Sequence, residues 1–120
     1  RNISLHDLEE YVEIRLAPLV TNEKWSPKVP WYDVSTLSDL QSVDLLIIDG
    51  PPKPVHPLVR FPALPFFMKR FSPNWVALLD DARRNGEQEI LRQWQDQFPN
   101  IFIKHLPLEK GAAIITPYKT

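Results

Sequence analysis

The sequence contains no cysteine, and only three glycines and one methionine occur among its 120 residues. Without cysteine, neither a disulfide framework nor a thiolate metal site can form, and we expect a reducing, cytoplasmic location. The three glycines, Gly50, Gly86 and Gly111, are far apart in the sequence. The chain therefore has no glycine-rich loop of the kind that binds nucleotides or dinucleotide cofactors.

The chain also lacks an excess of charge and a long apolar run. Its formal net charge of −1 at pH 7 gives no reason to expect nucleic acid or an anionic membrane surface as a partner. No apolar run approaches the roughly 18 residues that a membrane-spanning helix needs, and no secretory signal is visible. An apolar content of 43% predicts one packed domain over 1–120. The chain begins with Arg1, and its only methionine is Met68, so we interpret it as a piece of a longer protein.

Two short apolar runs end abruptly in acidic residues. Residues 43–48 are followed by Asp49, and residues 75–79 are followed by Asp80 and Asp81. An unbroken apolar run of five or six residues predicts a strand that is buried on both faces, as in a parallel sheet covered by helices. In open α/β sheets, ligands bind beyond the carboxyl ends of such strands. The three aspartates therefore predict a polar site at this edge of the sheet.

Three further strands are expected. Residues 11–16 alternate apolar and charged side chains, as a half-exposed strand does. Residues 101–106 and 112–116 are separated by only five residues, which is short enough for an antiparallel hairpin and too short for a helical crossover. The chain is thus predicted to close with a hairpin.

Two helices are expected, separated by the second acidic run. Residues 62–71 carry Pro62 and Pro65, which are tolerated in a first helical turn, whereas the prolines of 51–61 predict a stiff, extended loop. Residues 87–98 form the clearest helix, because its apolar positions lie on one face: Ile90, Leu91, Trp94 and Phe98. Of these, Trp94 is expected to lie in the core.

The order of these elements resembles the C-terminal two-thirds of a class I S-adenosylmethionine-dependent methyltransferase. The most specific pieces are Ile48-Asp49-Gly50-Pro51-Pro52, Leu79-Asp80-Asp81-Ala82 and Glu109-Lys110-Gly111. They are similar to a bacterial branch related to the small-molecule O-methyltransferases. The resemblance covers nearly the whole chain.

The resemblance implies an α/β fold, namely a Rossmann-like three-layer sandwich. Its sheet would be mainly parallel with an antiparallel last strand, and it would lack the first two strands of the family. Strand three would be 11–16, strands four and five 43–48 and 75–79, and strands six and seven 101–106 and 112–116. The seventh strand would lie beside the fifth.

The resemblance also implies an activity, which is transfer of a methyl group from S-adenosylmethionine to a small-molecule acceptor, most simply a hydroxyl. The family holds its cofactor mainly through a glycine-rich turn after strand one and an acid after strand two. This sequence contains neither element, so the fragment alone is expected to bind the cofactor poorly or not at all and to be inactive.

Three interpretations of Asp49, Asp80 and Asp81 remain open. In the metal-dependent O-methyltransferases, comparable acids hold a Mg²⁺ ion that polarises the acceptor hydroxyls, although Asp81 stands here where the family has asparagine. The three aspartates could instead bind the acceptor without a metal. Alternatively, they could be structural, with Asp81 capping a helix and the others accepting hydrogen bonds from loop amides.

Other residues are weaker candidates for the same site. His56, in the proline-rich loop, could act as a base toward an acceptor hydroxyl or could simply be solvated. Trp25, Trp31 and Tyr32 could line an aromatic acceptor pocket or could pack their own loop against the core. Four cations could recognise an anionic substrate or could form a solvated face: Lys53, Arg60, Lys69 and Arg70.

The alternative to an enzyme fragment is a noncatalytic Rossmann-like module for binding or assembly. The prolines of 51–57 have the spacing of polyproline ligands, although rigid loop chemistry explains them as well. Loss of strands one and two would leave 43–48 with an open edge, or would force 11–16 to pair with it. Because an open edge invites pairing with another chain, a homodimer through this edge is expected to be possible.

Overall fold

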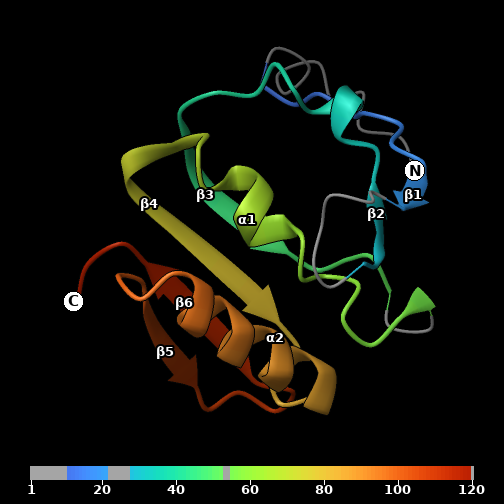
Figure 1. Cartoon of the computed structure of the whole chain (residues 1–120). Coiled ribbons are helices and arrows are strands. Elements are labelled where there is room, and N and C mark those ends of the chain that lie inside the picture. Colours follow the sequence, from blue (N-terminus) through green and yellow to red (C-terminus); the bar gives the residue numbers. More distant parts are fainter. Residues whose placement is uncertain (1–10, 22–27, 53–54, 120) are drawn as a thin grey trace.

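The computed structural model describes residues 11–21, 28–52 and 55–119 (Figure 1). Within these ranges the chain forms six strands and two α-helices. The elements in chain order are β1 (Leu19–Thr21), β2 (Pro30–Tyr32), the short 3-10 helix η1 (Val34–Thr36), β3 (Val43–Ile48), α1 (Ala63–Phe67), β4 (Phe71–Asp80), α2 (Asn85–Gln97), β5 (Phe102–Leu106) and β6 (Ala112–Thr116).

A four-stranded mixed sheet forms the centre of the molecule, with the strand order β3-β4-β6-β5. β3 and β4 are parallel, whereas β6 is antiparallel to both β4 and β5. Separately, β1 and β2 pair as a small antiparallel ribbon. The expected hairpin between 101–106 and 112–116 is confirmed, since β5 and β6 pair from Phe102↔Thr116 to Leu106↔Ala112.

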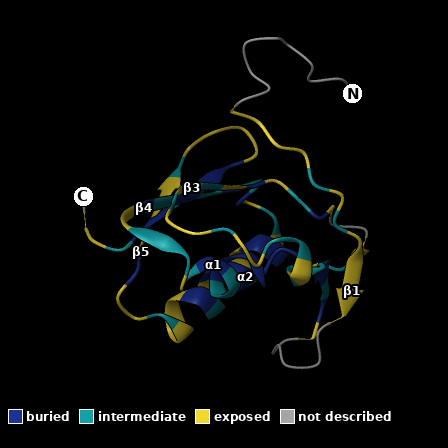
Figure 2. Ribbon diagram, turned by 90° about the horizontal axis from the view of Figure 1, so that it is seen from above, coloured by how far each residue is buried: buried dark blue, intermediate teal, exposed yellow. Residues whose placement is uncertain are grey.

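The predicted fold class, a three-layer sandwich with a mainly parallel sheet, is wrong. Only one of the three strand pairings in the four-stranded sheet is parallel. Only α2 is longer than seven residues, and Figure 2 shows α1 and α2 on the same side of the sheet. The connection between β3 and β4 is largely proline-rich loop and leaves room for only the five residues of α1.

The open face of the sheet explains the error. The apolar run of β3 predicted a strand covered on both sides, but Leu45 is 58% exposed and Ile47 is 62% exposed. On β4, the residues that face the helices (Trp75, Ala77 and Leu79) are buried, and those between them are only half-buried. An apolar run shows that a strand is apolar on both faces but cannot show whether both faces are covered.

The predicted strand over 11–16 is also wrong, because residues 12–18 have no regular structure. Their alternating pattern is present, but none of the described strands forms a ladder with them. Arg15 instead fixes this segment to η1, donating hydrogen bonds to the carbonyl oxygen of Thr36 (2.8 Å) and to the carboxylate of Asp39 (2.6 and 2.9 Å). This ion pair lowers the pKa of the Asp39 carboxyl, chiefly through the hydrogen bonds from Arg15.

The core lies between α2, the loop before α1 and one face of the sheet. Trp94 is fully buried, as expected, and its indole N–H donates a 2.9 Å hydrogen bond to the carbonyl oxygen of Phe61. Ile90 and Leu91 on the same helix are also buried, which confirms the apolar face predicted for 87–98. At 13 residues, α2 is the longest helix in the described ranges, and none there could cross a bilayer.

The first turn of α2 packs closely against the proline-rich loop at Gly86. A Cβ atom at this position would overlap the backbone carbonyl oxygen of Pro57 and lie 3.1 Å from its carbonyl carbon. We expect Gly86→Ala to lower the free energy of unfolding by about 2 kcal/mol, because overpacking against backbone outweighs the gain of about 1 kcal/mol in helix propensity. Urea denaturation followed by circular dichroism measures this change.

Gly50→Ala is the matched control for that substitution. Its Cβ would meet only the hydroxyl of Tyr32, at 2.8 Å, which is the end of a side chain that can move. A smaller loss of stability is therefore expected at Gly50 than at Gly86. If Gly86→Ala proves neutral or stabilising, the close packing of α2 on Pro57 is not rigid.

Candidate functional site

Three aspartates meet where β3 and β4 end. Asp49 follows β3, Asp80 is the last residue of β4, and Asp81 comes next. Because Ile48 pairs with Leu79 in the parallel register, the chain leaves both strands at the same edge of the sheet. One carboxylate oxygen of each aspartate lies within 4.8 Å of the others. The structure thus brings together the three residues that the sequence placed in one site.

A buried arginine lies beneath these carboxylates. Arg60 is only 3% exposed. Its guanidinium nitrogens lie 4.0 Å from a carboxylate oxygen of Asp49, 3.9 Å from Asp81 and 3.6 Å from Glu87. Since Glu87 is also buried, Arg60 and Glu87 form an ion pair largely removed from water, where charges interact more strongly than at the surface.

Arg60 also ties together the loops that carry the aspartates. Its Nε donates a 3.2 Å hydrogen bond to the carbonyl oxygen of Pro51, and Nη1 donates one of 3.2 Å to the carbonyl oxygen of Asp80. One side chain thus bridges the ends of β3 and β4. The sequence had suggested Arg60 as one of several cations for an anionic substrate; the structure surrounds it with carboxylates and carbonyls.

Asp81 is the most strongly engaged of the three aspartates. Its Oδ2 accepts a 2.6 Å hydrogen bond from Arg84, whose Nε lies 3.5 Å from Glu87. Its own amide donates a 2.9 Å hydrogen bond to Oδ1 of Asp80. The backbone of Asp81 has φ 56°, in the left-handed region that residues other than glycine seldom adopt. Asp81 is therefore largely committed to structural contacts.

The arrangement fits a hard cation in part. Carboxylate oxygens are the ligands that Mg²⁺ prefers, usually together with several waters. Asp49, with a side chain 70% exposed, and Asp80 can offer oxygens toward solvent. Asp81 fits less well, because Arg84 already occupies one of its oxygens. A metal here would be held by Asp49 and Asp80, close to the positive charge of Arg60.

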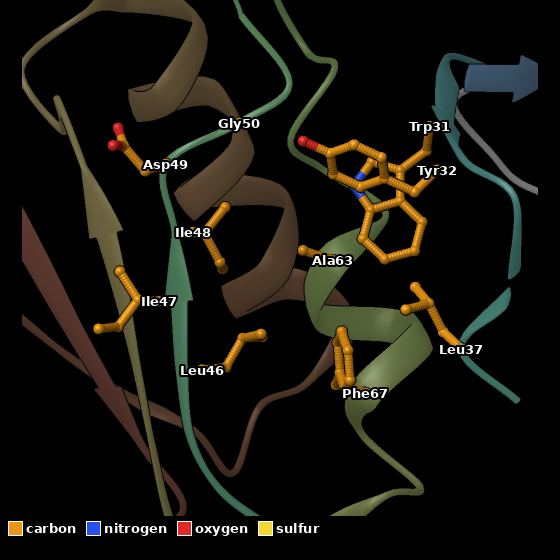
Figure 3. Close-up of a pocket in the computed structure, with 10 residues that line it drawn as sticks. All are labelled: Trp31, Tyr32, Leu37, Leu46, Ile47, Ile48, Asp49, Gly50, Ala63 and Phe67. Carbon is orange, nitrogen blue, oxygen red and sulfur yellow. The ribbon is translucent and has the colours of Figure 1, made fainter. Parts of the chain in front are cut away.

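An apolar cavity of about 390 Å³ runs along β3 on the side away from β4 (Figure 3). Figure 3 shows Trp31, Tyr32 and Phe67 on its far wall, whereas the carboxylate of Asp49 points away from them. The cavity and the aspartate cluster therefore meet at Asp49 and Gly50, whereas Asp80 and Asp81 do not line the cavity. The lining residues are Trp31, Tyr32, Leu37, Leu46, Ile47, Ile48, Asp49, Gly50, Ala63 and Phe67.

Trp31 packs its loop against the core and also lines the cavity. It is buried in the core cluster, where its ring contacts Phe66 and Phe67. Tyr32 projects its hydroxyl toward Gly50, at the boundary with the aspartates. Trp25 lies outside the described residues.

The remaining candidates make other contacts or lie outside the described residues. Nδ1 of His56 accepts a 3.0 Å hydrogen bond from the amide of Leu58. This ring nitrogen is thus engaged with the backbone of its own loop. Arg70 lies over the ring of Phe66, with its guanidinium carbon 4.1 Å from the ring centre, and Lys53 is not described.

Glu87 is a member of this network that was not among the residues expected at the site. Its position in the first turn of α2 by itself indicates only a favourable interaction with the positive helix end. The sequence feature that could have predicted its role is the spacing of Asp81, Arg84 and Glu87, in which charges of alternating sign lie three residues apart. That spacing matches the pairs seen here, from Arg84 to Asp81 and from Arg84 to Glu87.

Comparison with known protein families and curated sequences found no match for this chain. The two features of the described residues that bear on function are the aspartates at the strand ends and the aromatic cavity beside them.

Proposed function

We propose that this chain is the C-terminal portion of an S-adenosylmethionine-dependent methyltransferase of the cytoplasm, and that it supplies the binding site for a small acceptor hydroxyl. One observation carries the proposal: Asp49 and Asp80 lie together at the carboxyl ends of the parallel strands β3 and β4. This is where ligands bind in sheets built from parallel strands.

The strand arrangement supports the same proposal. β6, the last strand in the sequence, lies between β4 and β5 and runs antiparallel to both. The methyltransferase resemblance implies this position for the seventh strand, beside the fifth.

The described residues suit an acceptor better than the methyl donor. Asp49 and Asp80 would accept hydrogen bonds from acceptor hydroxyls, directly or through a bound Mg²⁺ that polarises them. Tyr32, which lines the cavity with its hydroxyl toward Gly50, would contact the ring of a catechol-like molecule. No glycine-rich turn for S-adenosylmethionine occurs in the described ranges, so in this proposal the cofactor is held by another part of the parent protein.

A noncatalytic binding or assembly module is the second candidate, and the burial of Arg60 favours it. A guanidinium that already compensates Asp49, Asp81 and Glu87 gives these acids a structural role. On this alternative, the edge of β3 rather than the aspartates would be the functional surface.

Catechol binding tests the acceptor site. We expect catechol, with and without Mg²⁺, to shift the amide signals of Gly50 and Asp81 in ¹H–¹⁵N spectra. Asp49→Ala should weaken this binding about tenfold or more, because a hydrogen bond to a carboxylate contributes about 1.5–3 kcal/mol. Tighter binding with Mg²⁺ than without it would assign a metal to the site.

Asp96→Ala is the matched control, since Asp96 is an exposed aspartate near the C-terminal end of α2. It should leave catechol binding unchanged. Absence of any shift up to about 10 mM catechol, in either condition, would contradict the acceptor site, because hydroxyl-binding sites in enzymes usually have millimolar or tighter affinities.

A further inference from the structure

Residues 11–16 have the sequence of a strand but no strand partner among the described residues. Apolar and charged side chains alternate along them, which is the pattern of a strand with one buried face. In the structure, however, Tyr11 is 79% exposed, Ile14 67% and Leu16 92%. Exposed apolar side chains gathered in one short segment commonly mark a surface that another molecule covers.

β3 presents the complementary feature, an edge without a partner. In the described sheet β3 pairs only with β4, so one row of its backbone N–H and C=O groups faces away from the sheet. An unpaired edge of this kind is a template for another strand. The protective features of natural edge strands are scarce here, since β3 contains no lysine or proline and one charged residue, Asp44.

The cavity beside β3 gives this edge a shape that suits an apolar strand. It runs along the free side of the strand and is walled by Leu37, Trp31 and Phe67 (Figure 3). A strand added here would direct alternate side chains into the cavity, as strands do. In residues 11–16, these would be Val12, Ile14 and Leu16.

The segment cannot easily reach the β3 edge of its own chain. Arg15 is fixed to Thr36 and Asp39, and the carbonyl oxygen of Pro18 accepts a 2.8 Å hydrogen bond from the amide of Asp33. These contacts hold residues 15–18 beside η1 and β2, across the cavity from β3 (Figure 1). The β3 edge of a second copy is not limited by these contacts and can meet the segment where it lies.

We propose that two copies of this chain associate by reciprocal strand addition, with residues 11–16 of each copy pairing with the open edge of β3 in the other. The six residues of the segment match the six of Val43–Ile48 in length. A two-fold exchange of this kind would bury on the order of 1,500 Å² in total, which is within the range of stable interfaces. The net charge of −1 gives little repulsion between copies.

Disulfide trapping tests the pairing directly, because the chain has no cysteine of its own. One preparation carries Glu13→Cys, and a second carries Leu45→Cys or Ile47→Cys. All three positions are exposed, so folding should be unaffected. Residues opposite each other on paired strands have Cα atoms about 4.5–5.5 Å apart, which a disulfide can span. We expect disulfides between the two preparations in a glutathione buffer.

The matched control is Phe102→Cys, an exposed position on β5 at the other edge of the same sheet. We expect Glu13→Cys to couple to β3 at least ten times faster than to this position. Equal rates at the two edges would overturn the proposal, as would the absence of any disulfide between the two preparations.

Sedimentation equilibrium provides a second measurement that needs no cysteine. The unsubstituted chain should form a dimer, and Ile14→Asp or Leu16→Asp should raise its dissociation constant at least tenfold. Leu108→Asp, in the exposed turn between β5 and β6, should have no such effect. A chain that is monomeric up to about 1 mM, the weak end of specific association, or a dimer unaffected by Ile14→Asp, would overturn the proposal.

Neither measurement involves the aspartates or an acceptor molecule. A failure of strand exchange would thus leave the catechol experiment unaffected, and a failure of catechol binding would leave strand exchange unaffected.

Discussion

Trp94→Ala is expected to lower the free energy of unfolding by about 3–5 kcal/mol, which is a large part of the total stability of a domain of this size. Trp94 is fully buried between α2 and the loop before α1, where its ring contacts Phe61. Removing the indole leaves a cavity and also leaves the carbonyl oxygen of Phe61 without its donor. Chemical denaturation monitored by circular dichroism measures the loss.

Trp94→Phe separates the two contributions to that loss. Phenylalanine keeps most of the apolar volume but cannot donate a hydrogen bond, so the expected cost is about 1–3 kcal/mol, the usual penalty of an unpaired buried acceptor. If Trp94→Ala cost less than about 1 kcal/mol, α2 would not be fixed to the rest of the core through this side chain. A Trp94→Phe variant as unstable as Trp94→Ala would assign the whole effect to the hydrogen bond.

The position of Trp94 illustrates what local sequence patterns can predict. Its helix was expected at 87–98 and extends over Asn85–Gln97. The strands at Val43–Ile48 and Ala112–Thr116 have the expected bounds. Each of these elements has a periodicity or an apolar run of its own, and each is held by neighbours close to it in the sheet or the core.

Predictions that depended on distant partners were less successful. The alternation in 11–16 predicted a strand, but a strand needs a neighbour, and none of the described strands is available to it. The prediction of three layers was wrong for a related reason. The sequence of β3 is apolar on both faces, yet Leu45 and Ile47 face outward because both helices lie on the other side.

The candidate site likewise has one part that local sequence predicts and one part that depends on tertiary structure. Convergence of Asp49 with Asp80 and Asp81 follows from two parallel strands that end in acid, so the sequence could predict it. The burial of Arg60 and Glu87 could not be predicted, because charged residues are rarely buried unless tertiary structure pairs them. Whether the aspartates serve a ligand or the fold therefore depends on these two residues.

Arg60→Met is expected to lower the free energy of unfolding by about 3–5 kcal/mol, as breaking a buried ion pair usually does. Methionine roughly keeps the length of the side chain but leaves the buried carboxylate of Glu87 with Arg84 as its one ion-pair partner in the described part of the chain. It also removes the donors to the carbonyl oxygens of Pro51 and Asp80. Arg92→Met is the control, because Arg92 pairs with Glu89 and Asp96 on the exposed side of α2 and should contribute less than about 1 kcal/mol.

The double variant Arg60→Met, Glu87→Gln determines where the cost arises. If the uncompensated charge of Glu87 dominates, glutamine should restore stability, and the two changes should be non-additive by about 0.5–3 kcal/mol. Full additivity would instead assign the loss to the hydrogen bonds with Pro51 and Asp80. If Arg60→Met alone costs less than about 1 kcal/mol, the fold does not need this cation beneath the aspartates. The parallel register would still bring Asp49 and Asp80 together, but a bound ligand would then be the better explanation of why both strand ends are acidic.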